Sequence, residues 1–113
     1  MVKVSRRQVD GVTILDLKGK IVIGTGDLAL RNAVQEALNE GSRALLLNLR
    51  DVTTIDSSGV GELVSAYTTT ATRGVKLKLV ALPPKVNDIL LITQLISVFE
   101  VYDDEASALA SFR

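Results

Sequence analysis

The stretch that decides the fold lies in the middle of the 113-residue chain and reads Ala44-Leu45-Leu46-Leu47-Asn48-Leu49. Its nearly unbroken apolar character is typical of a central β-strand that is covered on both faces. The turn Ile55-Asp56-Ser57-Ser58-Gly59-Val60-Gly61 follows it. Beyond this turn apolar residues recur at the spacing of one helix face, at Val60, Leu63, Val64, Tyr67 and Ala71, until Arg73-Gly74 ends the pattern. These residues therefore predict a buried strand, a polar turn and an amphipathic helix.

The segments before the central strand predict a hairpin and another helix. Val2-Lys3-Val4 and residues 12–17 flank Asp10-Gly11, a pair suited to a tight turn because Gly tolerates positive φ. The apolar run continues through Ile21-Val22-Ile23 and breaks at Gly24-Thr25-Gly26. From Asp27 onward, and with Gly41 at the expected end, helical spacing relates Leu30, Ala33, Val34, Ala37 and Leu38.

The segments after residue 74 continue the alternation of strands and helices. Residues 75–80 alternate like a strand with one face partly wet, and Pro83-Pro84 opens a helix that carries Val86, Ile89 and Leu90 and extends toward Thr93. The apolar residues near its end, Leu91, Ile92, Leu95 and Ile96, could form a surface patch, but core packing is the favoured use of most of them. Residues 98–101 predict a last strand, and Asp103-Asp104 begin a final helix with Ala106, Leu109 and Ala110 inward.

The resulting order is ββαβαβαβα, which predicts an α/β fold with about four helices. Strands joined through helices run parallel, so the sheet is mixed but mostly parallel, and the opening hairpin supplies its antiparallel member. A chain of this length without linkers or repeats is expected to form one domain over residues 1–113.

Composition argues against most enzyme designs. The chain contains no Cys and no His, which removes thiolate chemistry, thiolate or imidazole metal sites and the usual imidazole base. We expect no metal and no cofactor. Lys plus Arg and Asp plus Glu both number 13, and Arg6-Arg7 is the only adjacent basic pair, so nucleic acid is not an expected partner. No signal peptide or membrane span is apparent, and we expect a soluble, cytoplasmic protein.

One candidate site is a nucleotide-binding turn at residues 24–29. Gly24-Thr25-Gly26-Asp27-Leu28-Ala29 matches G-x-G-x-x-A between a strand and a helix. The chain is too short for a full dinucleotide fold, and Asp51 is only an approximate match to the acidic residue that binds ribose. A flexible strand-to-helix turn, with Asp27 near the helix N-terminus, is the favoured interpretation.

The second candidate site is the turn at residues 55–61. Ser57 or Ser58 would serve as the helix N-cap. A catalytic serine is disfavoured because a nucleophile elbow needs Gly two residues before it, where Ile55 and Asp56 stand, and because no His is present to take the proton. Nothing in the sequence places a lysine beside either hydroxyl, so we do not expect an enzyme.

The motif Asp56-Ser57-Ser58-Gly59-Val60-Gly61, after Leu47-Asn48-Leu49-Arg50-Asp51-Val52, resembles the signature of STAS domains, specifically the bacterial anti-sigma factor antagonists. The resemblance covers essentially the whole chain. It implies a single STAS-like domain that binds an anti-sigma factor, itself a serine kinase, and so releases a sigma factor. Phosphorylation of Ser57, with Ser58 as second choice, would stop this binding, and a phosphoserine phosphatase would reset it.

The same resemblance implies that the partner docks over one end of the domain, where the expected contacts are Val22, Ile55, Asp56, Ser57, Ser58, Gly59 and Val60. Many family members carry an acidic residue where this chain has Val22. An alternative is therefore a STAS scaffold or docking domain of a signalling assembly without regulatory phosphorylation. A nucleotide-binding domain is a third, less favoured alternative. Oligomeric state has no signal in the sequence.

Overall fold

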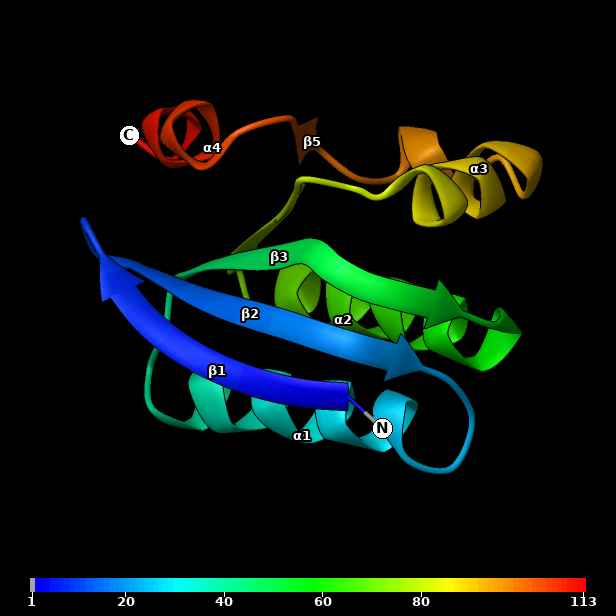
Figure 1. Cartoon of the computed structure of the whole chain (residues 1–113). Helices are drawn as coiled ribbons and strands as arrows, with labels where there is room; N and C mark the ends of the chain where they lie inside the picture. Colours follow the sequence, from blue (N-terminus) through cyan, green and yellow to red (C-terminus); the bar gives the residue numbers. More distant parts are fainter. Residues whose placement is uncertain (1) are drawn as a thin grey trace.

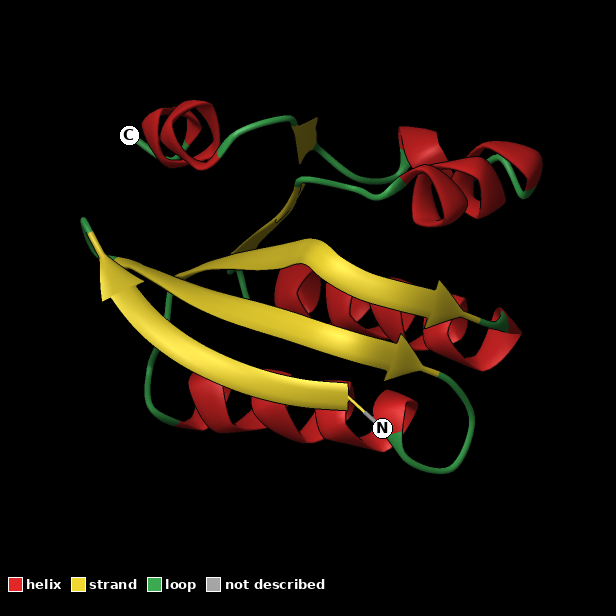
Figure 2. Ribbon diagram, viewed as in Figure 1, coloured by secondary structure: helices red, strands yellow, loops and turns green. Residues whose placement is uncertain are grey.

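A five-stranded sheet in the order β1-β2-β3-β4-β5 forms the centre of the protein, in a computed structural model that describes residues 2–113 (Figure 1, Figure 2). β1 and β2 are antiparallel, and the other neighbouring strands are parallel. The elements along the chain are β1 (Val2–Val9), β2 (Val12–Ile21), α1 (Gly26–Asn39), β3 (Ala44–Ile55), α2 (Ser57–Thr72), β4 (Lys76–Val80), α3 (Pro84–Ile92), a 3₁₀ turn (Leu95–Ser97), β5 (Val101–Tyr102) and α4 (Glu105–Ser111). The predicted order and the antiparallel hairpin are confirmed.

β3 is the central strand that the sequence predicts, and helices cover both of its faces. Leu45, Leu47 and Leu49 are fully buried in the main core, which also contains the apolar faces of α1 and α2. Leu46 points to the opposite face and packs with Ala108 of α4. The alternation of β3 between two apolar layers explains why its sequence has no polar face.

The two layers of helix differ in extent. Val86 and Leu90 of α3 join the main core with α1 and α2, whereas α4 forms a smaller cluster over Val12, Ile14, Leu46 and Val80. The short α4 therefore covers only part of its face of the sheet (Figure 2). None of the helices formed by residues 2–113 has the length and apolar character needed to cross a lipid bilayer.

Two sequence-based expectations are wrong near the chain's end, the extent of the last strand and the inward face of the final helix. The last strand is only Val101–Tyr102, because residues 95–97 form a 3₁₀ turn and the side chain of Phe99 is buried in the main core. Ala108 is the buried residue of α4, whereas Ala106 and Ala110 are exposed. Tertiary contacts with the narrow edge of the sheet decide this face, since seven residues hold too few turns for spacing to define it.

Other apolar assignments also need correction. Leu91 and Ile92 are exposed, at 51% and 81%, while Leu95 and Ile96 pack against the main core as expected. Ala71 of α2 is exposed as well. In β4, Lys76 is exposed as a partly wet strand predicts, but Lys78 is buried because α4 covers it.

Candidate protein-binding site

The predicted site lies where β2 and β3 end side by side. Ile21 and Ile55, the last residues of these parallel strands, are direct partners in the sheet. α1 and α2 begin just beyond them, so the loop at residues 22–25 and the turn at Asp56 share one edge of the sheet (Figure 1). This carboxyl edge of parallel strands is the place where α/β proteins usually bind their ligands.

Asp56 joins the two segments at this edge. Its Oδ1 accepts a hydrogen bond from the Gly59 amide at 2.9 Å, and its Oδ2 accepts one from the Ile23 amide at 3.0 Å. These backbone donors hold the pKa of the Asp56 carboxyl below its usual value, because they favour the charged form. The one carboxylate therefore caps α2 and also fixes the loop that precedes α1.

The predicted N-cap at Ser57 or Ser58 is wrong, since Asp56 occupies that position with an extended backbone. Ser57 is the first residue of α2 and is exposed, and Ser58 is partly exposed. Neither hydroxyl takes part in a hydrogen bond between side chains or from side chain to backbone within residues 2–113. Asp performs the capping, which leaves the Ser57 hydroxyl available at the surface.

Two glycines allow both helices to begin this close to the sheet. A Cβ on Gly59 would overlap the Ile21 carbonyl oxygen and would lie 2.7 Å from Cγ1 of Ile55. A Cβ on Gly26 would overlap the Lys20 carbonyl oxygen and lie 2.7 Å from the Ile21 Cα. Neither residue has a positive φ, so close approach, and not backbone conformation, requires glycine at these positions.

The expected contact residues divide into exposed and buried ones. Ser57 is exposed, and Val22, Ile55, Asp56 and Ser58 are partly exposed, so all five can contribute to a surface. Gly59 and Val60 are buried, and the Val60 side chain belongs to the main core.

Sequence reasoning missed two apolar residues beside the turn, Ile23 and Leu28. Ile23, whose amide donates to Asp56, is 72% exposed. Leu28, in the first turn of α1, is 44% exposed. The apolar run through Ile23 gave no signal of this exposure, because β2 ends at Ile21 and the run continues for two residues beyond it.

The nucleotide alternative finds little support in this geometry. The Asp27 carboxylate accepts a hydrogen bond from the Leu28 amide at 2.8 Å, so an anion already occupies the N-terminal turn of α1. Asp51 lies within β3 and is not at the end of the strand. Within the described residues, no group of three or more His, Cys, Asp or Glu side chains is arranged to hold a metal ion.

The fold and this edge define a small α/β module with a capped serine turn and exposed apolar neighbours. The STAS domain model matches residues 3–108, and the chain belongs to the STAS domain family.

Its relatives carry related names. A protein of Thermotoga maritima, provisionally named an anti-sigma factor antagonist, is 30% identical over 105 residues, 93% of each chain. A crystal structure under that name from the same organism superposes with a TM-score of 0.88 at 29% identity, covering 96% of this chain and 92% of the other. The anti-sigma F factor antagonist of Paenibacillus polymyxa is 28% identical over 88% of this chain and 85% of its own. The unphosphorylated form of the anti-sigma factor antagonist SpoIIAA shares the fold, with a TM-score of 0.81 at 18% identity over 98% of this chain and 96% of its own.

Proposed function

We propose that this protein is an anti-sigma factor antagonist, which binds an anti-sigma factor and thereby frees a sigma factor. The named relatives support the class, and the edge formed by the ends of β2 and β3 supports the place of binding. Ile23 and Leu28 supply exposed apolar area there, beside the partly exposed Val22 and Ile55. Apolar area ringed by polar groups is the usual centre of a protein interface.

The observation that carries the proposal is the position of Ser57. Its side chain is exposed on the first residue of α2, next to the carboxylate that fixes the Ile23 loop. A kinase can reach this hydroxyl without unfolding the helix. The partner in this proposal is an anti-sigma factor that is also the serine kinase, and a phosphoserine phosphatase reverses the modification. The proposed role is binding and not catalysis, and the proposed location is the cytoplasm.

Phosphorylation would act on the interface and not on the fold. A phosphate on Ser57 adds about −1.5 to −2 charges at neutral pH. The adjacent Asp56 carboxylate already accepts the Gly59 amide, so a phosphate on Ser57 lies beside a second anion at the helix start. The modified turn therefore presents clustered negative charge to a docked partner.

The magnitudes are sufficient for a switch. Burying an unpaired anion in an interface costs several kcal/mol. Changing a complex from 99:1 bound to 1:99 takes about 5.5 kcal/mol. A dianion beside Asp56 falls in this range without any change of conformation.

The experiment uses the purified chain with its cognate anti-sigma factor kinase and ATP. Mass spectrometry of wild type and Ser58→Ala is expected to show one added phosphoryl group, which Ser57→Ala lacks. In calorimetry Ser57→Ala binds the partner as wild type does, and Ser57→Asp binds at least tenfold more weakly. Modification that persists in Ser57→Ala would refute the assignment.

A second candidate is a STAS docking domain that binds its partner without regulatory phosphorylation. The observation that favours it is Val22, which leaves no acidic side chain in the first residue after β2. Asp27, the next carboxylate along the chain, lies in the first turn of α1 and accepts a hydrogen bond from the Leu28 amide. Equal partner binding by wild type and Ser57→Asp would select this candidate over the phosphorylation switch.

A further inference from the structure

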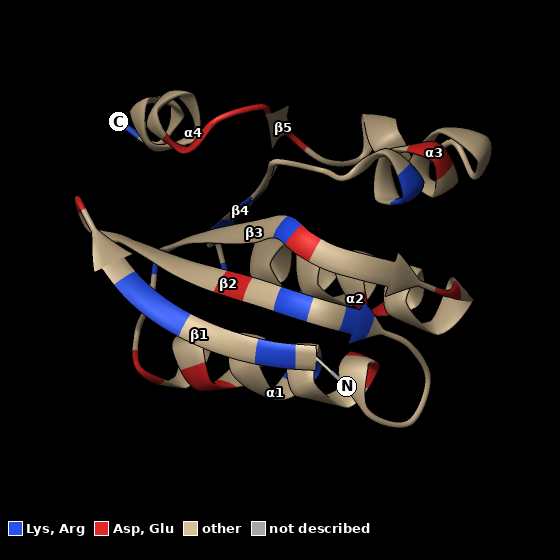
Figure 3. Ribbon diagram, viewed as in Figure 1, with Lys and Arg blue, Asp and Glu red and all other residues tan. Residues whose placement is uncertain are grey.

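Within residues 2–113, one part of the sheet carries no helix on the face opposite α1 and α2. α4 covers that face only around Val12, Ile14, Leu46 and Val80. The remaining area, which we call the open face, runs over β1, the second half of β2 and the bend of β3. Figure 3 shows blue bands along β1 and β2 and adjacent blue and red bands at the bend of β3. The charged residues of the open face are Lys3, Lys18, Lys20, Arg50 and Asp51.

Strand alternation assigns the lysines to this face. Leu15 and Leu17 of β2 point into the main core, so Lys18 and Lys20 lie on the same side as Asp16. In β1, Val2 and Val4 face the core, which places Lys3 on the open side as well. All three lysines, Lys3, Lys18 and Lys20, are exposed.

A β-bulge in β3 adds two more charges. Asp16 pairs with Asn48 but Lys18 pairs with Asp51, so β3 has one extra residue in this interval. Leu49 and Val52 are consequently both buried, whereas Arg50 and Asp51 are both exposed between them. The bulge therefore places an arginine and an aspartate together at the bend of the strand.

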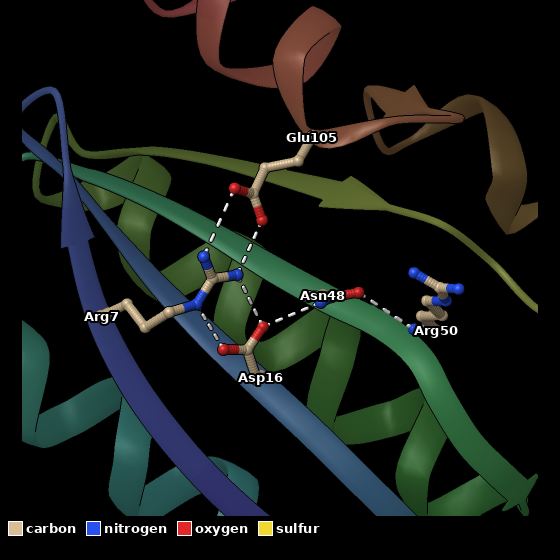
Figure 4. Close-up of polar contacts among 5 residues, drawn as sticks. All are labelled: Arg7, Asp16, Asn48, Arg50 and Glu105. Atoms are coloured by element: carbon tan, nitrogen blue, oxygen red, sulfur yellow. Dashed lines mark hydrogen bonds and ion pairs between the residues drawn. The ribbon is translucent and has the colours of Figure 1, made fainter.

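The charge of Arg7, farther along β1, is already compensated. Its guanidinium pairs with Asp16 at 2.6 Å and with Glu105 of α4 at 2.7 Å, and Asn48 donates to Asp16 at 2.8 Å (Figure 4). These carboxylates raise the Arg7 pKa far above its usual value. The network fixes α4 to the sheet and neutralises the arginine beside the open face.

The four other cations are not compensated in this way. Among the ion pairs within residues 2–113, none includes Lys3, Lys18, Lys20 or Arg50, and Asp51 lies among them as the sheet partner of Lys18. Lys3 and Lys18 are direct partners on antiparallel strands. Like charges in that position oppose strand pairing, and a bound anion would relieve the repulsion.

We propose that the open face binds an acidic, extended segment of a partner protein. Lys18 and Lys20 are two residues apart on one strand, which separates them by roughly 6.6 Å. An extended peptide repeats its side chains on one face at the same interval, so carboxylates at alternate positions match both lysines. Asp103, Asp104 and Glu105 line one hollow with Arg50. They limit the cationic surface to a few side chains, which suits a short acidic segment better than a continuous polyanion such as a duplex.

The test is an NMR titration of the ¹⁵N-labelled chain with a capped ten-residue peptide of alternating Glu and Ser. Amide shifts are expected at Lys3, Lys18, Lys20 and Arg50. The double variant Lys18→Glu/Lys20→Glu should bind about tenfold more weakly, as expected when two screened surface contacts are reversed. Lys76→Glu, which changes an exposed strand lysine at the other end of the sheet, should bind as wild type does.

Several results would overturn the proposal. One is a set of amide shifts that lie mainly outside the open face, and another is a loss of affinity in Lys76→Glu equal to that in the double variant. Equal binding of an alternating Lys and Ser peptide would also contradict it. So would tighter binding of a mixed-sequence 20-nucleotide DNA strand, or of vesicles containing phosphatidylserine, than of the Glu and Ser peptide.

A stability measurement separates a binding role from a structural one. Lys3→Glu places opposite charges across the hairpin, so its Tm should rise by about 2 °C while its affinity for the Glu and Ser peptide falls. A lower Tm, or unchanged peptide affinity, would contradict the geometry.

Discussion

The close contact between α2 and the sheet makes Gly59 a position where a single methyl group has a large predicted effect on this edge. In Gly59→Ala the added Cβ overlaps the Ile21 carbonyl oxygen and lies 2.7 Å from Cγ1 of Ile55. Carbon atoms in contact normally lie about 3.5–4.0 Å apart, so the start of α2 must move by about 1 Å. Because one obstacle is backbone, the helix and not a flexible side chain has to yield.

The size of the effect follows from two opposing contributions. Forcing a methyl group into a filled site costs about 3 kcal/mol at the upper end of overpacking, while Ala favours the helix over Gly by about 1 kcal/mol. The expected net loss is about 2 kcal/mol. Gly61 lies in the same helix, and a Cβ there meets nothing within 4 Å. Gly61→Ala should therefore gain about 1 kcal/mol from helix propensity alone.

Urea unfolding followed by circular dichroism, together with thermal melts, measures both variants against wild type. Relative to wild type, Tm should fall by about 8 °C in Gly59→Ala and rise by about 4 °C in Gly61→Ala. If both variants are stabilised to the same extent, α2 does not approach β2 as described, and the reasoning about the Ser57 turn fails with it.

Three further predictions concern charged side chains. The pKa of Asp56 is lowered in the folded protein, so its stabilising effect is present above its unfolded pKa of about 3.9 and is lost as pH falls through the folded value. The difference in urea midpoint between wild type and Asp56→Asn should therefore be clear at pH 7 and should disappear toward pH 2. Lys78 is 6% exposed and donates to the Ser111 carbonyl oxygen at 3.0 Å. Lys78→Ala should lower the free energy of unfolding by about 2 kcal/mol and speed hydrogen exchange in α4, whereas Lys78→Met, which keeps the apolar stem, should lower it by about 1 kcal/mol. Equal losses in the two variants would show that packing of the stem contributes nothing. Glu105→Gln removes one partner of Arg7 at a half-exposed site and should lower the free energy of unfolding by less than about 1 kcal/mol, a loss that 1 M NaCl abolishes. A loss of stability that salt does not change would argue against an electrostatic origin.

Much of the fold could be predicted because local patterns agree with it. The apolar run at residues 44–49, Asp10-Gly11 and the helical spacing after Asp27 are short-range signals, and each element they predict is present. The final strand could not be predicted in the same way. Phe99 lies in a β-branched and aromatic segment that is typical of a strand, but its side chain fills the core beside Tyr67, with ring centroids 5.6 Å apart.

The candidate site was predicted as a segment more accurately than as a set of contacts. Ser57 and Asp56 lie at the helix start and the expected sheet edge. The helix cap differs from the expectation, because Asp and Ser are comparable N-caps and sequence cannot choose between neighbours. The burial of Val60 and the exposure of Ile23 likewise depend on how the first turn of α2 meets the end of β2.

By itself, the sequence determined the order of strands and helices, the central position of residues 44–49 and the serine turn that follows them. These features depend on periodicity and turn chemistry within a few residues. Only the tertiary structure decided that Asp56 joins the Ile23 loop to Gly59, and that a bulge sets Arg50 and Asp51 side by side. Both depend on the register between β2 and β3, strands separated by an entire helix, and that register is fixed by packing across the sheet.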